Sequence, residues 1–358
     1  MERKNYIDNI RWIVTLILFP YHTLMVYNSF GESFYVKGAD LNFTAYIIGS
    51  IWPWIMPLLF LISGIGSYYS LQKRNIKEYA KERFHRLFVP LVFGILLLVP
   101  LQTFIAEKFH NSYHGGYLKQ YILFFTKPTD LSGYNGGFTP AHLWFILYLF
   151  IISMVSLPLM YLFMKRKKSI KGEKINLLQL ILFFIIPVLS QVVLDISGKS
   201  MGEYLAWFLI GFFIMSNNEV QLRLQKYRII LSVMALFFLT LYGFYGIILP
   251  NTSLIIYELI YGLYSHISIL AILGMGKQYL NYNNRFTLYM TKSSFGIYFL
   301  HQNWIVITAF FAVITIRSIP IQIVTILISS IVLTFLTEYT FSKIPVIRYV
   351  FGLIKGAK

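Results

Sequence analysis

The sequence predicts an all-α polytopic membrane protein with about ten transmembrane helices and both termini in the cytoplasm. Composition is the first reason: 57% of the 358 residues are hydrophobic and 18% are aromatic, whereas only 13% are charged. Soluble domains carry far more charge than this. The other two reasons are a series of long apolar stretches and an uneven distribution of lysine and arginine along the chain.

Ten stretches are apolar and long enough, or nearly so, to cross a bilayer as helices. They lie at about 12–30, 46–71, 87–106, 141–164, 175–194, 204–216, 229–250, 253–275, 293–315 and 320–341. The first is too long for the apolar core of a signal peptide and has no small-residue cleavage site, so we expect it to remain as a helix. We expect residues 1–358 to form a single membrane domain with no separate soluble domain.

The basic residues give the topology. With a cytoplasmic N-terminus and ten crossings, all but six of the 31 Lys and Arg residues lie on the inner side, most densely around 73–86 and 165–174. The six on the outer side are Lys37, Lys108, Lys119, Lys127, Lys199 and Arg317. This positive-inside pattern explains the net charge of +17 and favours contact with anionic membrane lipid over nucleic acid.

Several kinds of chemistry lack their motifs. The chain has no cysteine, so neither disulfides nor thiolate sites are expected. It contains no P-loop, no dinucleotide-binding glycine pattern, no nucleophile elbow and no tight metal-ligand cluster, so we expect no metal and no tightly bound cofactor. In the outer loop, residues 117–125 form an amphipathic run that could lie on the membrane surface or fold back over a site.

The first apolar stretch carries Arg11 and His22, which are eleven residues apart. On a helix this spacing is only about 20° from full turns, so both side chains share one face, together with Asp8 and Thr15. The rise of roughly 16 Å places His22 near the middle of the bilayer when Arg11 lies at its surface. Such a histidine either bonds neighbouring helices together or serves as a base, because its pKa is close to neutrality.

Polar residues of the next segments have two interpretations each. Arg83 and Arg86 are three residues apart, share a helix face, and are either ordinary positive-inside charge or a fork for phosphate. Ser63 belongs to a small-residue patch with Gly64 and Gly66, which allows close helix packing or leaves room for a ligand.

Later segments contain further histidines. His142 and Trp144 are an interfacial anchor or the lining of a cavity mouth. His301 lies at about the depth of His22, which suggests a shared polar cavity. Glu258 and His266 are two turns apart on the eighth stretch and predict a second polar strip.

Five motifs, in this order, resemble those of the acyltransferase 3 family of integral membrane acyltransferases. They are Arg11-x10-His22 preceded by Asp8, the Ser-Gly segment Phe60–Gly64, Arg83-x-x-Arg86 followed by Pro90, the helix start Leu143-Trp144-Phe145, and the run from Ser294 to His301. Within the family the chain looks most like the stand-alone, glucan-modifying type.

The resemblance implies transfer of an acetyl or succinyl group from cytoplasmic acyl-coenzyme A, most simply acetyl-coenzyme A, to a hydroxyl of a cell-envelope glycan, a lipid-linked sugar or a related acceptor. It implies a bacterial plasma membrane location. His22 and Arg11 would be catalytic, and Arg83 and Arg86 would bind the donor. Supporting roles would fall to Asp8, Ser63, Trp144 and His301. The competing interpretation is a multispan transporter or flippase for a saccharide or polar lipid, which would use the same residues without forming bonds.

Overall fold

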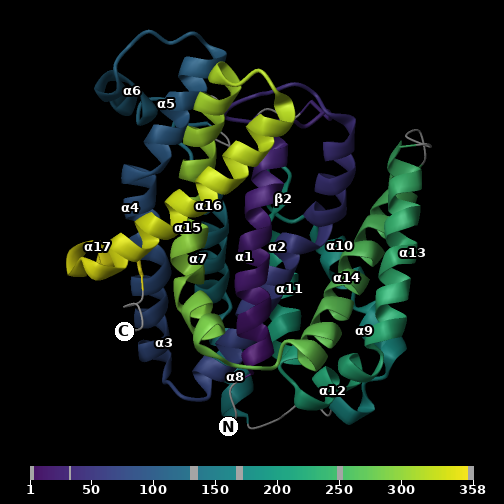
Figure 1. The fold of residues 1–358 in the computed structure, drawn as a ribbon. Helices are drawn as coiled ribbons and strands as arrows, with labels where there is room; N and C mark the ends of the chain where they lie inside the picture. Colours follow the sequence, from purple (N-terminus) through teal and green to yellow (C-terminus); the bar gives the residue numbers. More distant parts are fainter. Residues whose placement is uncertain (1–3, 32–33, 130–135, 167–171, 248–252, 354–358) are drawn as a thin grey trace. The chain divides into compact units, whose positions relative to one another are not determined.

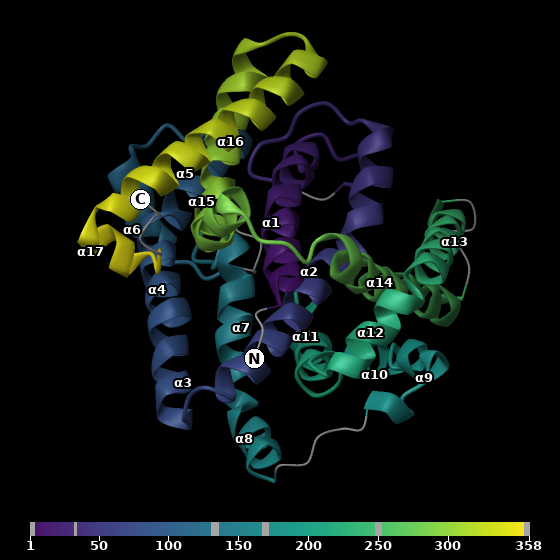
Figure 2. The same cartoon turned by 60° about the horizontal axis from the view of Figure 1, so that its bottom comes forward.

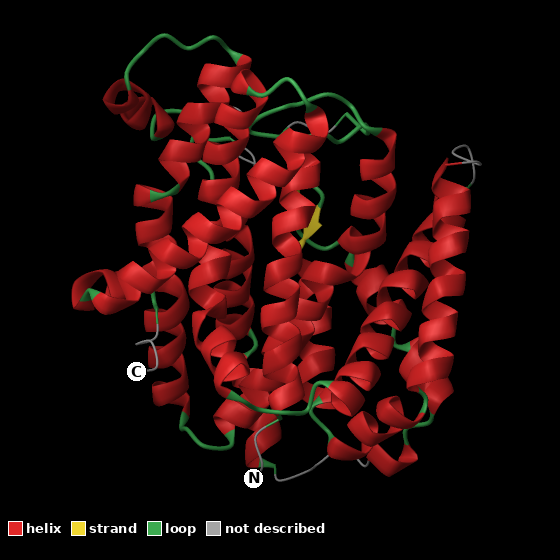
Figure 3. Ribbon diagram, viewed as in Figure 1, coloured by secondary structure: helices red, strands yellow, loops and turns green. Residues whose placement is uncertain are grey.

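Most of the described residues are helical (Figure 1, Figure 3), as the sequence predicts. The structure is a computed structural model and describes residues 4–31, 34–129, 136–166, 172–247 and 253–353. In these ranges the strands are confined to one antiparallel hairpin, β1 (Asp195–Ile196) and β2 (Lys199–Ser200). Its turn uses the left-handed conformation at Ser197 and Gly198. Residues 167–171 of the lysine-rich loop lie outside the described residues.

Six of the described helical segments are long and apolar enough to cross a membrane. They are α2 (Asn42–Leu71), the run Ile76–His110, α13 (Arg228–Ile247), α14 (Leu254–Tyr279), α15 (Arg285–Thr315) and α16 (Ile319–Lys343). The run comprises α3 (Ile76–Arg83), the π-helical turn η1 (Phe84–Phe88), α4 (Val89–Leu97) and α5 (Val99–His110). A seventh span is counted if two helical segments that meet at a bend of 45° form one crossing. The first consists of the turn η2 (Ala141–Leu143) and α7 (Trp144–Val155), and the second is α8 (Leu157–Lys165).

Each of the ten predicted stretches overlaps helix, but the described helices do not confirm ten crossings. The pairs α9 (Leu177–Leu182) with α10 (Ile185–Ser190), and α11 (Met201–Ile210) with the π-helical turn η4 (Gly211–Met215), are apolar but short. The first helix, α1 (Asn5–Met25), is absent from the six because Asp8, Arg11 and His22 lower its hydropathy. Shorter connecting elements are α6 (Tyr117–Phe124), η3 (Gly172–Lys174), α12 (Asn218–Lys226) and α17 (Pro345–Val350).

The chain forms two compact units. The first unit comprises Met1–Arg11, Gly49–Arg83 and Tyr148–Asn284, and the second comprises Trp12–Ile48, Phe84–Leu147 and Arg285–Lys358. Helices α1, α2 and α7 each contribute one end to either unit. Each unit is therefore built from segments that are distant in sequence. Each functional residue is described within the unit to which it belongs.

In the first unit, α2 packs unusually close to α11 and η4. A Cβ atom on Gly64 would lie 2.0 Å from the carbonyl oxygen of Phe208, and one on Gly211 would lie 2.1 Å from that of Leu61. Two backbones can approach this closely only where side chains are missing on the facing surfaces. The small-residue patch of α2 therefore serves helix packing at Gly64. Helices α13 and α14 lie side by side in the same unit (Figure 1, Figure 2).

In the second unit, α15 lies along α16 (Figure 1), and α5 packs on α15. The buried side of α16 repeats every four residues and is polar except at Ile326: Gln322, Ile326, Ser330, Thr334, Glu338 and Ser342. Trp304 Nε1 of α15 donates to Thr337 Oγ1 of α16 at 3.0 Å. In a membrane the hydrophobic effect does not drive helices together, so hydrogen bonds between polar side chains help to hold neighbouring helices in contact.

The amphipathic run predicted at residues 117–125 forms a helix, α6. Its buried side carries Gln120 and Phe124, whereas Leu118 and Ile122 are 78% and 66% exposed. Gln120 Nε2 donates to the carbonyl oxygen of Gly136 at 2.7 Å, which ties α6 to the segment that leads to η2.

Candidate active site

Helix α1 positions the two residues on which the sequence prediction depends. The helix is continuous from Asn5 to Met25 even though Pro20 lies inside it, so Arg11 and His22 share a face as expected. Arg11 Nη1 and Asp8 Oδ1 form an ion pair at 3.1 Å, one helical turn apart. The carboxylate thereby orients the guanidinium on this face of the helix.

In the second unit, three histidines from three elements meet. The ring centroids of His22 on α1 and His301 on α15 are 5.3 Å apart, and those of His301 and His142 on η2 are 5.5 Å apart. His142 and His301 are buried, and His22 keeps part of its surface exposed. The shared polar site suggested by the depths of His22 and His301 is therefore present in the geometry, and His142 extends it.

Hydrogen bonds to main-chain carbonyls determine where two of these rings carry their protons. A carbonyl oxygen can only accept, so a neutral imidazole bonded to it must donate through that nitrogen. His142 Nε2 bonds to the carbonyl oxygen of Phe299 at 3.1 Å, and His301 Nδ1 bonds to that of Tyr298 at 2.5 Å. In the neutral rings, His142 Nδ1 and His301 Nε2 therefore carry lone pairs.

Two nitrogens of the cluster remain without a hydrogen bond. Among the described residues, neither His22 Nδ1 nor His301 Nε2 has a partner, although both atoms are buried. Leaving a buried polar atom unpaired costs roughly 1–3 kcal/mol, so such atoms mark strain or a site awaiting a ligand. His22 Nδ1 and His301 Nε2 lie on neighbouring rings, and the tautomer of His301 leaves a lone pair on its Nε2. Together the two nitrogens form a place where a hydroxyl proton can be bound.

Aromatic side chains surround the three histidines. Phe34 is stacked on His22 with centroids 6.0 Å apart and planes at 17°, and Phe19 meets His301 edge to face at 5.8 Å. Tyr298 lies 6.2 Å from His142 and donates its hydroxyl to the His142 carbonyl oxygen. These rings lower the local dielectric, which strengthens electrostatic interactions with whatever enters the site.

Side-chain amides support the cluster from the side of His142. Gln102 Nε2 lies 3.4 Å from His142 Nδ1 and also donates to Asn303 Oδ1. Asn303 Nδ2 donates to the carbonyl oxygen of Leu98 at 2.9 Å, so the amide that faces His142 is itself held in place. Sequence reasoning did not single out Gln102, although a glutamine within the apolar stretch 87–106 was an available signal.

The first unit holds a cationic site around the C-terminal half of α2. Arg83 Nη2 donates to Ser67 Oγ at 3.0 Å, and its guanidinium lies 4.9 Å from the ring centre of Tyr79. The Arg11 guanidinium is the nearest group to a Cβ built on Gly66, at 3.8 Å. Because Gly66 and Ser67 are consecutive, two guanidiniums meet the same turn of α2, an arrangement suited to an anion.

Arg83 and Arg86 do not have the relationship that α-helical spacing predicts. Arg83 ends α3, and the π-helical turn η1 that begins at the next residue contains Arg86. A π turn holds more residues than an α turn, so two residues three apart no longer lie above one another. Arg83 is partly buried in the first unit, whereas Arg86 is exposed in the second.

Comparison with known proteins identifies the chain. Residues 4–339 match the acyltransferase domain that defines the acyltransferase 3 family, nearly the whole chain. The chain belongs to this family. It is a membrane acyltransferase.

Relatives of the acyltransferase carry the name glucans biosynthesis protein C. The protein from Salmonella paratyphi B is 24% identical over 330 residues, which cover 84% of this chain and 82% of the relative. The protein from Salmonella heidelberg is 27% identical over 221 residues, covering 60% of this chain and 54% of the relative. No solved structure matches the chain.

Ser63 and Trp144 are the remaining residues that the sequence predicts for the site of the acyltransferase. Ser63 Oγ donates to the carbonyl oxygen of Leu59 at 2.8 Å, within its own helix. Trp144 is buried at the start of α7, directly after η2, so it continues the segment that carries His142. Among the described residues, no group of His, Asp and Glu is arranged to hold a metal ion.

Proposed function

We propose that this acyltransferase moves an acyl group from acyl-coenzyme A to a hydroxyl of a cell-envelope glycan or a related acceptor. The observation that carries the proposal is the cluster of His22, His142 and His301, with unpaired nitrogens on His22 and His301. O-acyl transfer needs a base that takes the hydroxyl proton and returns it to the leaving thiolate.

In the direct mechanism, His22 acts as a general base. It takes the proton from the acceptor hydroxyl while the oxygen attacks the thioester carbonyl. The C–O bond forms, the C–S bond breaks, and the imidazolium returns its proton to the coenzyme A thiolate, which leaves as a thiol. His301, whose Nδ1 is held by the Tyr298 carbonyl, presents its lone pair on Nε2 and can share the proton with His22.

In the alternative mechanism, His22 carries the acyl group. Its nitrogen attacks the thioester, the thiol leaves with a proton, and the acceptor hydroxyl then attacks the acyl-imidazole and restores the free ring. The two mechanisms differ in one measurable species. Acid quenching during turnover, followed by mass spectrometry of the peptide containing His22, detects an acyl adduct only in this second case.

The donor is proposed to bind through arginines. Acyl-coenzyme A carries several phosphate charges, and a guanidinium bonds phosphate through paired N–H groups. Arg11 of α1 and Arg83 of α3 both approach the same turn of α2, at Gly66 and Ser67, and Arg86 is exposed in the π turn that follows α3. We assign phosphate binding to Arg83 and Arg86, and to Arg11 the positioning of the donor with stabilisation of developing charge.

The relatives support the proposed acceptor and location. Their name, glucans biosynthesis protein C, refers to a glucan, and their organisms are bacteria. We therefore propose a glucan or similar envelope saccharide as acceptor, an acetyl or succinyl group as the transferred unit, and the bacterial plasma membrane as the site of action, with the donor arriving from the cytoplasm.

The test uses the purified acyltransferase in lipid nanodiscs with radiolabelled acetyl- or succinyl-coenzyme A and a mixed glycan pool. The parent protein is expected to label glycan, and His22→Ala is expected to lose the activity by roughly 10²- to 10⁴-fold. His114→Ala is the matched control, because His114 is exposed and lies outside the cluster of three histidines. Normal transfer by His22→Ala would refute the role of His22. Saccharide flux without any acyl transfer by the parent would support the transporter interpretation instead.

A further inference from the structure

A short segment of the second unit covers one face of His22. This segment, Phe34–Asp40, is named here the strap, and it belongs to the connection between α1 and α2. Its first three side chains, Phe34, Tyr35 and Val36, are 2%, 0% and 0% exposed. Connections between helices usually lie on the surface, so complete burial of three consecutive aromatic or branched residues needs a reason.

The ring of Phe34 supplies the contact. It lies nearly parallel to the His22 imidazole, at 17°, with centroids 6.0 Å apart. The carbonyl oxygen of the same residue accepts a hydrogen bond from His110 Nε2 at 2.6 Å, which ties the strap to the end of α5. Because the bond is to the backbone of Phe34, it limits movement of the ring along His22.

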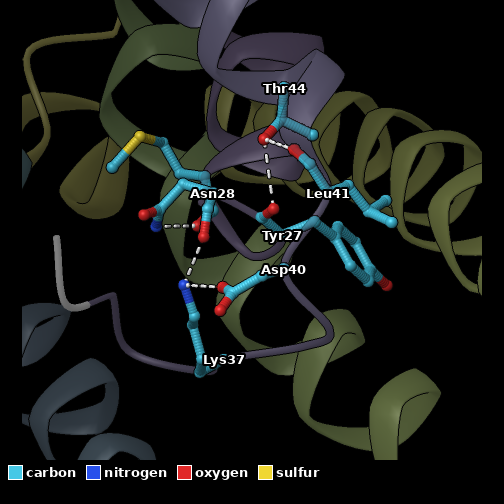
Figure 4. A network of polar contacts seen from close by, with 7 residues as sticks. Tyr27, Asn28, Lys37, Asp40, Leu41 and Thr44 are labelled. Carbon is cyan, nitrogen blue, oxygen red and sulfur yellow. Dashed lines mark hydrogen bonds and ion pairs between the residues drawn. The ribbon is translucent and has the colours of Figure 1, made fainter. Parts of the chain in front are cut away.

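Polar contacts anchor the other end of the strap (Figure 4). The ammonium of Lys37 donates to the carbonyl oxygen of Asn28 and pairs with Asp40 Oδ1 at 2.8 Å. Thr44 Oγ1 donates to the carbonyl oxygens of Tyr27 and Leu41, at the point where α2 begins. The strap is thereby fastened to the residues that directly follow α1, the helix that carries His22.

Gly38 allows the strap to lie close to the chain it is fastened to. Its N–H donates to the carbonyl oxygen of Val26 at 2.7 Å, and a Cβ atom at this position would lie 2.5 Å from the ring of Tyr27. The Tyr27 ring cannot easily move aside, because it is fully buried and its hydroxyl donates to Gln322 Oε1 at 3.0 Å. Any larger residue at position 38 must therefore displace the strap.

We propose that Phe34 is a positioning residue for His22, held against the imidazole by the strap, and that the strap forms one wall of the acceptor site. This inference rests on the proposed function, in which His22 is the reacting histidine. Phe34 fixes the plane of the ring and thereby the direction of the unpaired Nδ1 of the partly exposed His22, which receives the acceptor hydroxyl. The hydrogen bond between His110 and the Phe34 carbonyl oxygen holds the strap at a fixed position relative to the end of α5.

The first experiment measures coverage of position 22 without any need for enzyme activity. The chain has no cysteine, so His22→Cys introduces a single thiol. The rate of maleimide labelling is measured in nanodiscs, where both faces of the membrane are accessible. Adding Phe34→Ala is expected to speed labelling by about tenfold, because the stacked ring no longer covers the site. Adding Phe30→Ala, which changes an exposed ring of the same connection, is the control and is expected to leave the rate unchanged.

A second variant guards against a folding defect in Phe34→Ala. Gly38→Ala keeps the Phe34 ring but displaces the strap, so it is also expected to speed labelling, whereas Gly49→Ala, with nothing within 4 Å of its added Cβ, is not. Equal labelling rates in all four backgrounds would overturn the proposal even if acyl transfer is confirmed.

The second experiment separates positioning from general damage. In the protein with intact His22, Phe34→Leu is expected to lower kcat by about tenfold with little change in KM for acyl-coenzyme A. Phe34→Tyr is expected to keep kcat close to that of the parent, because it retains the stacked ring. A merely structural role would not distinguish Leu from Tyr in this way. Equal loss in both variants, or a change confined to KM for the donor, would overturn the assignment.

Discussion

Both units bury histidine side chains, but the side chains next to these histidines differ. In the first unit, His266 of α14 is fully buried, donates Nε2–H to the carbonyl oxygen of Leu180 at 2.8 Å, and lies against the indole of Trp207 at 5.2 Å. Its Nδ1 is buried without a hydrogen bond among the described residues, as in the cluster, but its ring neighbour is an indole and not a second imidazole. In the second unit, three imidazoles from three elements meet, and two of them present unpaired nitrogens to the cluster. Burial alone therefore does not mark a reactive histidine. The neighbouring titratable groups do, because a proton must have somewhere to go.

The same comparison explains the polar strip predicted on the eighth stretch. Spacing places Glu258 and His266 two turns apart, but the group that lies against the His266 imidazole is the indole of Trp207. Trp207 Nε1 donates to Glu203 Oε1 at 3.3 Å, so the indole lies between a buried glutamate and the imidazole. Glu258 is only partly buried. An indole cannot relay a proton as an imidazole can, so we interpret this group as structural.

The largest effect expected from the comparison of the two units tests that interpretation directly. His301→Gln is expected to lower acyl transfer by roughly 10²-fold, since the lone pair next to His22 is lost. His266→Gln is expected to keep activity close to that of the parent but to lower the melting temperature, since losing the Nε2–H donor leaves the buried carbonyl oxygen of Leu180 unpaired at a cost of roughly 1–3 kcal/mol. Labelled-donor assays and thermal unfolding in the same detergent measure both. Equal activity losses would remove the distinction between the two units.

The next effect concerns stability of the first unit. Gly64→Ala places a Cβ atom 2.0 Å from the Phe208 carbonyl oxygen, a backbone atom that cannot rotate away. We expect destabilisation of about 1–3 kcal/mol by overpacking. Gly49→Ala on the same helix meets nothing within 4 Å and is the matched control. Thermal unfolding monitored by tryptophan fluorescence compares the two, and equal melting temperatures would contradict the close approach of α2 and α11.

A smaller effect is expected in donor binding. Arg83→Lys keeps the charge but loses the planar fork, so KM for acyl-coenzyme A should rise by about tenfold while kcat changes little. Arg74→Lys is the control in the same loop region, because Arg74 pairs with Glu82 at 3.0 Å and is not placed in the donor site. If kcat falls and KM does not, Arg83 acts on the reaction and not on binding.

The smallest effect is expected at that control position. The Arg74–Glu82 pair has side chains 42% and 22% exposed, and exposed ion pairs contribute about 0–1 kcal/mol. Arg74→Ala should therefore shift the melting temperature only slightly, and the shift should vanish at high salt. A large, salt-independent loss would show that this loop contributes more to the first unit than its exposure indicates.

Much of the helical organisation could be predicted from the sequence, because hydrophobic periodicity is a local property. All ten apolar stretches overlap helix, the run 117–125 is helical, and Arg11 and His22 share α1. Local patterns were less informative where the backbone departs from regular geometry. The π turn after Arg83 changes the relation between Arg83 and Arg86, and nothing in their spacing indicates it. Polar residues also lower the hydropathy of α1, so its own composition leaves its crossing unconfirmed.

The sequence by itself determined the membrane class, the family and the residues of interest: Arg11 and His22 on one helix, and His301 at a similar depth on another. Only the tertiary structure decided that His142 joins them, that Gln102 supports the group, and that Phe34 covers His22. The reason is physical. Periodicity fixes which side chains share a face of one helix, but the meeting of side chains from separate elements depends on long-range packing, which no single segment encodes.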